Sequence, residues 1–368
     1  MRKSLLALWI FVASLCAAPA QMMQDIVNAT VTPSAPSGFT GVGDIVSGAK
    51  IWFGLRAYNA AYAASLGSAI TIRRASDNTT QTIAVTSAGN LNIAAANTFA
   101  GTDATCSGTI SGTTATLSGC SSTPTVGDTL TGTGIIGPSF VTAVGTFTSG
   151  AGTVTLNEGQ TVSSSETITF QVGMFISEWF DQSGTNFCSS AACNISVSTA
   201  ANQYELLPNC FGSLPCAFAD NQNFPGNTSA FTSISPPWSL EVVGERFLGA
   251  SGGGIFFDDN NTEQIFRSSA NTWEGGTTAG NVAVAATDAV AHGATFATTT
   301  TGGVFDVDGV TNTGTFTTPA FATPLFLGNS ISYMSEFGVW AVTFSSGNQA
   351  SLCHNQFVYW GSLFGTSC

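Results

Sequence analysis

Short apolar alternations run through most of the chain, and Gly, Asn or Asp interrupts them about every ten residues, a spacing typical of β-sandwiches and barrels. Alternation with a period of two is the pattern of a half-buried strand. Hydrophobic residues make up 43% of the chain and 27 of them are Phe, which is enough for a sizeable core. The sequence therefore predicts an all-β fold with few short helices.

Two short helices are expected. Residues 57–66 place apolar side chains at four-residue spacing, with Gly67 as the C-cap, and lead into a strand at 69–73. A second helix at 346–359 would pack Phe357 and Trp360 against the core.

The region from 238 to 340 predicts a run of strands. Asp308-Gly309 lies between alternating apolar residues, which favours a hairpin with a type I′ turn. Residues 333–344 alternate well enough to be a core strand of the sandwich.

The N-terminus has the layout of a secretory signal peptide. Arg2 and Lys3 precede an apolar run at 5–15, and small residues follow. We expect a signal peptide at 1–20 and a spacer at 21–47. The apolar run is shorter than the ~20 residues that cross a bilayer, so we expect no membrane span in the mature chain. The localisation predicted is secreted, either extracellular or at the cell surface.

Residues 101–170 differ in composition from the rest of the chain. Thr, Gly and Ser dominate there and aromatic residues almost disappear. This stretch is predicted to be a small inserted β module, while 48–100 and 171–368 together form the main sandwich.

Nine cysteines are present, and removal of Cys16 with the signal peptide leaves eight in an oxidising compartment. Spacing alone does not determine their pairing, and the simplest hypothesis joins neighbours along the chain. The predicted disulfides are Cys106–Cys120, Cys188–Cys193, Cys210–Cys216 and Cys353–Cys368. No CxxC spacing occurs, and only His292 and His354 could add ligands, so neither a metal nor a cofactor is predicted.

The charge balance excludes one class of partner. Charged residues make up 8% of the chain, eight are Lys or Arg, and the net charge is -13. Because nucleic-acid binding depends on a basic surface, no nucleic-acid partner is expected.

Two stretches resemble the catalytic module of the arabinofuranosidase B family. The first comprises Leu55-Arg56-Ala57-Tyr58, 72–80 and Ala88-Gly89-Asn90-Leu91, and the second is Trp179-Phe180-Asp181-Gln182-Ser183-Gly184. The resemblance implies a concanavalin-like jelly roll. It also implies a polysaccharide or glycan partner containing arabinose, and the release of terminal arabinofuranose with retention.

Retaining hydrolysis uses two carboxyl groups ~5 Å apart. By resemblance, Glu274 in Trp-Glu-Gly-Gly would be the nucleophile. Asn329 occupies the position of the family's acid/base. Because Asn is not a carboxylic acid, the sequence assigns no acid/base.

Other residues are candidates for sugar contact. Asp181 either touches a sugar or bonds its own turn. Trp238, Trp273 and Tyr333 either pack in the core or, if exposed, stack on a sugar ring, with Asn329 bonding its hydroxyls. Three functions stay open: an arabinofuranosidase, a glycan-binding module without catalysis, and a structural or adhesive surface protein of a bacterium or phage.

Overall fold

The computed structural model describes residues 38–360 except 136, 138, 186, 189–192, 212–213, 220–223, 226–232, 247–253, 259–262, 270, 278–279, 287–289, 319, 322–325 and 328–331. The predicted signal peptide and most of the predicted spacer lie outside these residues. The described part of the chain is mostly strand, as predicted, and its paired strands are antiparallel.

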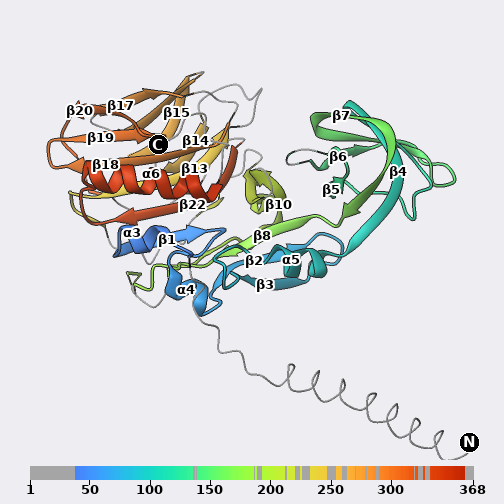
Figure 1. Ribbon diagram of the computed structural model, residues 1–368, viewed down its shortest axis with the longest axis horizontal. Coiled ribbons are helices and arrows are strands. Elements are labelled where there is room, and N and C mark those ends of the chain that lie inside the picture. The colour runs from blue at the N-terminus through green and yellow to red at the C-terminus, as the bar shows by residue number, and fades with distance from the viewer. Residues whose placement is uncertain are drawn as a thin grey trace, which may run out of the picture.

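The largest sheet has 12 strands and forms the main body of the molecule (Figure 1). Ten of them lie in the order β20-β19-β18-β13-β22-β11-β10-β8-β2-β3, while β1 pairs with β22 and β9 with β8. Their bounds are β1 Ala49–Gly54, β2 Ser68–Arg74, β3 Thr80–Ala84, β8 Met174–Trp179, β9 Ile195–Ser196, β10 Tyr204–Phe211, β11 Leu214–Ala219, β13 Ser239–Arg246, β18 His292–Thr299, β19 Gly302–Val307, β20 Val310–Thr315 and β22 Ser332–Trp340.

A second sheet packs against one face of the first and completes an all-β sandwich. Its order is β12-β21-β14-β15-β16-β17. The bounds are β12 Phe224–Pro225, β14 Gly254–Asp258, β15 Glu263–Ser269, β16 Thr272–Thr277, β17 Gly280–Ala285 and β21 Phe326–Leu327. Gly275 allows close approach here, because a Cβ at this position would lie 2.7 Å from the rings of Phe296 and Phe305 on the facing sheet. The main core lies between the two sheets.

Helix α6 (Ser346–Trp360) covers the opposite face of the large sheet (Figure 1). The Gln349 side chain donates to the Thr295 hydroxyl at 2.9 Å, and Trp360 is buried against Phe211. The predicted C-terminal helix is confirmed, with Phe357 packed against the core and Trp360 inside it.

Three further helices among the described residues are short: α3 Val42–Ile45, α4 Ala60–Ala64 and α5 Ile93–Ala100, with a 3₁₀ turn at Ala200–Asn202. Helix α4 begins at Asn59, whose side chain accepts a hydrogen bond from the Tyr62 N–H at 2.8 Å. The predicted C-cap at Gly67 is wrong, because the helix ends at Ala64 and Ser65 is its C-cap. Leu66 takes the left-handed conformation, with φ of 53°, and the Gly67 N–H closes the turn on the Tyr62 carbonyl.

The hairpin prediction is confirmed. Strands β19 and β20 flank Asp308 and Gly309, whose φ angles are 52° and 81° as a type I′ turn requires. The predicted core strand at 333–344 ends earlier, because β22 stops at Trp340.

The third sheet consists of β4 Thr102–Ser118, β5 Thr129–Gly132, β6 Val141–Val144 and β7 Gly152–Gln171, and forms the smaller lobe in Figure 1. Thr102 pairs with Gln171, so the chain enters and leaves this sheet at one place. The sheet has its own hydrophobic cluster.

Candidate functional site

The two stretches that carry the family resemblance are bound to each other. The Gln182 amide accepts from the Tyr58 N–H at 3.1 Å and donates to the Gly54 carbonyl at 2.8 Å. The Leu55 carbonyl accepts from the Leu91 N–H at 3.1 Å. These stretches therefore form one scaffold, although more than 120 positions separate their parts.

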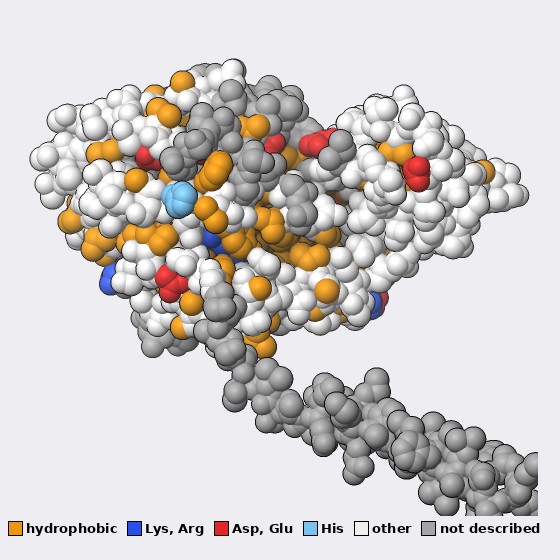
Figure 2. All heavy atoms as spheres, viewed as in Figure 1, with side chains coloured by type: hydrophobic (Ala, Val, Ile, Leu, Met, Phe, Trp, Pro, Cys, Tyr) orange, Lys and Arg blue, Asp and Glu red, His pale blue; other side chains and the backbone are white. Residues whose placement is uncertain are grey.

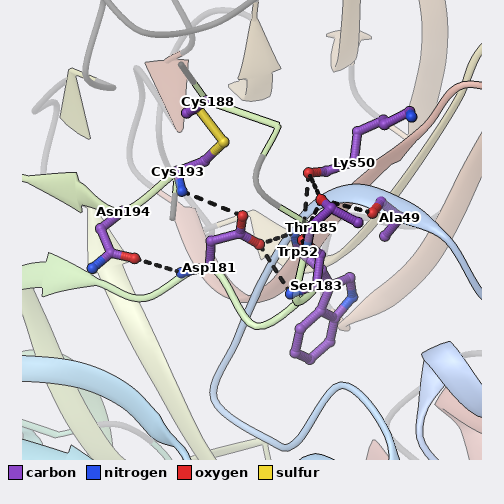
Figure 3. The surroundings of a disulfide bond; sticks show 9 residues. All are labelled: Ala49, Lys50, Trp52, Asp181, Ser183, Thr185, Cys188, Cys193 and Asn194. Atoms are coloured by element: carbon purple, nitrogen blue, oxygen red, sulfur yellow. Dashed lines mark hydrogen bonds between the residues drawn. A yellow bond between two sulfur atoms is a disulfide. The ribbon is translucent and has the colours of Figure 1, made fainter. Parts of the chain in front are cut away.

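Asp181 lies inside this scaffold, as Figure 3 shows. Its carboxylate accepts hydrogen bonds from the N–H groups of Trp52 and Ser183, each at 3.0 Å, and of Cys193 at 3.4 Å. Burial raises the pKa of Asp181, while these hydrogen bonds oppose the rise. Because backbone donors surround it and it is 9% exposed, its arrangement is that of a turn residue.

Asn194 and Thr185 extend the same network. Asn194 accepts from the Asp181 N–H at 3.1 Å, and the Thr185 hydroxyl donates to the Lys50 carbonyl at 2.6 Å (Figure 3). The disulfide Cys188–Cys193 closes the loop beside Asp181.

A buried charged cluster lies beneath α6. The Arg56 guanidinium bonds both carboxylate oxygens of Glu336, at 2.5 and 2.9 Å. Glu241 accepts from the Trp52 indole N–H at 3.3 Å and from the Gln356 amide. Burial, followed by the neighbouring Glu336, raises the pKa of Glu241 well above its ordinary value. All three side chains are fully buried, so they form part of the core.

A groove of about 740 Å³ lies directly above this cluster, between α6 and the segment that precedes β1. Its lining residues are Gly38, Phe39, Thr40, Ile45, Asn90, Leu214, Ala350, Ser351, His354, Asn355, Val358 and Tyr359. Figure 2 shows a histidine and several hydrophobic side chains on the face that carries α6.

The groove combines aromatic rings with amides. Phe39 and Tyr359 meet edge to face, with ring centroids 6.4 Å apart. The Tyr359 hydroxyl donates to the Asn90 amide oxygen at 2.7 Å, and the Arg56 guanidinium lies 4.6 Å from the centre of the Tyr359 ring. Arg56 and Asn90, both from the family-like stretch, thus position the tyrosine.

Asn355 joins the two walls of the groove. Its amide nitrogen donates to the Thr40 carbonyl at 2.7 Å, and its amide oxygen is buried. None of the groove's lining residues is Asp, Glu, Lys or Arg. The groove is therefore a neutral surface with two ring faces and several hydrogen-bonding groups.

Sequence reasoning missed most of this groove. In the sequence, Asn90 stands out only as part of a motif and His354 only as a possible metal ligand. Phe39 and Tyr359 lack a local signal, because they come together only when the two ends of the described chain fold together.

Glu274 lies on β16, away from the groove. It is half-buried, and among the described residues its hydrogen-bond partner is the Asn281 amide at 3.0 Å. Its neighbour Trp273 points into the core, so Glu274 points to the other face of its sheet. Asn329 lies outside the described residues.

The three candidate aromatics are buried, which favours core packing and corrects their prediction as sugar-binding residues. Trp238 and Trp273 are 0% exposed and Tyr333 is 1% exposed. Trp238 packs on Phe296, and Trp273 packs on His292, with ring centroids 5.7 and 5.1 Å apart respectively. These rings fill the sandwich, so none of the three has an open face for a sugar.

Tyr333 instead joins the third sheet to the large one. Its hydroxyl donates to the Glu158 carboxylate at 2.7 Å, and its direct neighbour across the strands is Glu245. Burial, then Glu158, raises the pKa of Glu245 to about 7, while His292 opposes the rise. The pKa of Glu158 is also raised by burial.

Three of the predicted disulfides are present: Cys106–Cys120, Cys188–Cys193 and Cys210–Cys216. Cys353 is disulfide-bonded as well, and its predicted partner Cys368 lies outside the described residues. Within the described residues, no three His, Cys, Asp or Glu side chains are placed to hold a metal ion. None of the helices described there has the length and apolar character needed to cross a membrane.

Comparison with known proteins gives only distant structural likenesses. No family model and no curated protein matches the chain. A GH54 α-L-arabinofuranosidase soaked with a cyclic sulfate inhibitor aligns with 86% of this chain and 64% of its own, at 12% identity and a TM-score of 0.44. An arabinofuranosidase complexed with arabinofuranosyl-α-1,2-xylobiose aligns with 89% of this chain and 66% of its own, at 13% identity and a TM-score of 0.40. The chain thus spans less than two thirds of the length of these proteins, and the likeness assigns no role to any residue.

Proposed function

We propose that this is a secreted carbohydrate-binding protein that holds a neutral sugar in the groove beside α6. The observation that carries the proposal is the lining of that groove, which has two aromatic rings, two amides and no charged side chain. Sugar rings stack on aromatic faces while amides bond their hydroxyls. The family-like stretches support an arabinose-containing glycan, because they supply Asn90 and the Arg56 beneath Tyr359.

Binding without hydrolysis fits this chemistry better than catalysis. A retaining glycosidase needs two carboxyl groups ~5 Å apart around the scissile bond. The groove has no carboxylate among its described lining residues, and Glu274 lies on the second sheet, where it accepts a hydrogen bond from Asn281 on the neighbouring strand β17.

Secretion is supported by the disulfides, because such bonds persist in oxidising compartments. The signal-peptide pattern at 1–20 points the same way.

The proposal is tested by titrating the purified protein with arabino-oligosaccharides, with cello-oligosaccharides as the comparison, in a calorimeter. Loss of one aromatic contact is worth about 0.5–1.5 kcal/mol, so Phe39→Ala should weaken binding roughly two- to tenfold. Val310→Ala is the matched control, since Val310 is 51% exposed and lies outside the groove. Equal affinity of Phe39→Ala and the wild type would place the ligand elsewhere.

A parallel assay tests hydrolysis on a chromogenic arabinofuranoside. We expect no release by the wild type. Release that Glu274→Gln abolishes would contradict the binding-only assignment and identify Glu274 as a catalytic carboxylate.

A further inference from the structure

Five Asn-X-Ser/Thr triplets occur in the chain, none with Pro at the middle position. This triplet is the acceptor motif for N-linked glycosylation of secreted proteins. Such triplets also arise by chance in a sequence rich in Thr and Ser, so the surroundings of each asparagine decide whether it fits the modification. Asn78 and Asn194 lie in the part of the chain that the structure describes, while the triplets at 28, 227 and 260 lie outside it.

Asn78 lies in the turn of the hairpin that joins β2 and β3. Its backbone N–H donates to the Arg74 carbonyl at 3.0 Å, and the Arg74 N–H donates to the Thr79 carbonyl at 2.9 Å, so the turn is closed by its own residues. Asn78 takes the left-handed conformation, with φ of 59°, which Asn adopts more readily than most residues. Residues 75–82 are all exposed. The triplet Asn78-Thr79-Thr80 is therefore displayed on a local turn at the surface.

The side chain of Asn78 is held by its oxygen and presents its nitrogen. The Arg73 guanidinium donates to the Asn78 amide oxygen at 2.9 Å. The amide nitrogen, which is the atom that carries the sugar in an N-linked glycan, has no hydrogen-bond partner among the described residues. Because the oxygen is not modified, attachment of a sugar would leave the hydrogen bond to Arg73 intact.

The surroundings of Asn78 leave room for a large group. Strand β3 is the last strand at one edge of the large sheet and lies at the lower margin of the molecule in Figure 1. Its first three residues, Thr80, Gln81 and Thr82, are exposed. No residue of this turn lines the groove beside α6. A glycan on Asn78 would therefore extend into solvent from an open edge and away from the lining of the groove.

Asn194 carries the same motif in unsuitable surroundings. It is half-buried, its amide oxygen accepts from the Asp181 N–H at 3.1 Å, and its amide nitrogen donates to the Glu178 carboxylate at 3.2 Å. The disulfide-bonded Cys193 directly precedes it (Figure 3). A glycan on this nitrogen would displace Glu178 and crowd the turn at Asp181. Of the two described triplets, the one at Asn78 therefore fits the modification.

We propose that Asn78 is a site of N-linked glycosylation. In the transfer, the Asn78 amide nitrogen gives up one proton and bonds the anomeric carbon of a lipid-linked oligosaccharide, from which the lipid pyrophosphate leaves. The donor and the oligosaccharyltransferase belong to the secretory pathway. The inference thus rests on the proposed secretion of the protein and does not depend on sugar binding in the groove.

The test uses the full chain expressed in yeast and collected from the medium. Peptide N-glycosidase in heavy-oxygen water converts each glycosylated Asn into an Asp that carries one heavy oxygen, and mass spectrometry of peptides locates this label. We expect label at residue 78 and none at residue 194. A second version, with the yeast host's own signal peptide in place of residues 1–20, enters the pathway independently of the predicted signal.

Thr80→Ala removes the hydroxyl residue of the triplet and should abolish the label at residue 78. Thr79→Ala is the matched control, because it removes a neighbouring exposed hydroxyl from the same turn and keeps the triplet. Ser196→Ala, which removes the triplet at Asn194, should leave the labelling pattern unchanged. Near-UV circular dichroism checks that each variant is folded.

The proposal would be overturned by an unlabelled residue 78 in both secreted versions, by label at residue 194 without label at residue 78, or by label at residue 78 that survives in Thr80→Ala. Secreted protein without label at residue 78 would leave the proposed secretion standing. Absence of the native-signal version from the medium would contradict the secretion alone, because the version with the yeast signal still reports on Asn78.

Discussion

Arg56 and Glu336 form a two-point ion pair in which both side chains are fully buried, although they lie 280 positions apart in the sequence. Glu336 belongs to β22 and pairs with Gly54 at the end of β1. The ion pair therefore fixes the start of the family-like scaffold to the central strand of the large sheet, beneath the tyrosine of the groove.

Arg56→Met should destabilise the protein by about 3–5 kcal/mol, because it leaves the buried Glu336 carboxylate without its counter-charge. Urea unfolding measures this change. Arg74→Met is the control. Arg74 pairs with Asp77 at the surface, and such a pair contributes about 0–1 kcal/mol. Similar midpoints for the two variants would contradict the assigned importance of the buried pair.

The Glu245 carboxyl should make stability depend on pH. Its pKa is about 7 in the folded protein and 4.5 as the ordinary value. A raised folded pKa gives stability that is fully present below pH 4.5 and is lost as the pH rises through 7. The Glu245→Gln variant never ionises at this position. Its free energy of unfolding should therefore rise relative to that of the wild type by on the order of 2 kcal/mol between pH 4.5 and 8.

Unfolding midpoints of the two proteins across that pH range are the measurement. Glu158→Gln removes the neighbouring negative charge, so it should shift the transition to lower pH, while His292 still favours the ionised form. A difference between Glu245→Gln and the wild type that is constant with pH would show that Glu245 does not titrate in this range.

Removal of residues 102–171 should leave a folded sandwich. The Val172 N–H donates to the Gly101 carbonyl at 3.1 Å, so the two ends are already in contact and a short Gly/Ser linker joins them without strain. A cooperative thermal transition and native near-UV circular dichroism are expected. Glycan binding should persist, because no lining residue of the groove lies within the deleted segment.

The Cys106–Cys120 disulfide should stabilise mainly the third sheet. It closes a loop with a sequence separation of 14, for which chain entropy predicts about 3 kcal/mol. The Cys106→Ala, Cys120→Ala double variant should speed hydrogen exchange in β4 and β7 and leave β13 and β22 protected. Equal loss of protection in all four strands would show that the sheets unfold as one unit.

Features governed by neighbouring residues were predictable from the sequence. The hairpin at Asp308-Gly309 was predictable because a type I′ turn requires positive φ angles, which Asp and Gly adopt readily. The three observed disulfides join cysteines separated by 14, 5 and 6 positions, so pairing with the nearest cysteine was a sound rule. The end of α4 was not predictable in the same way, because Leu66 adopts the left-handed conformation, which the neighbouring Gly67 could have adopted more easily.

Features governed by distant strands were not predictable. Alternation places Trp238 and Trp273 on one face of a strand, but which face is covered depends on the second sheet and on rings such as Phe296. The charge pair of Arg56 and Glu336 also has no local signal. The groove follows the same rule, since it is lined by segments far apart in the chain.

The groove has a consequence for the order in which the protein becomes functional during synthesis. One wall begins at Phe39 and another belongs to α6, and the Asn355 amide joins them by bonding Thr40, 315 positions earlier. A nascent chain can pair most of its strands before α6 leaves the ribosome, but it has no groove until then. Ligand immobilised on a column should therefore retain only molecules whose α6 has docked, and it would separate them from truncated products that have folded sheets.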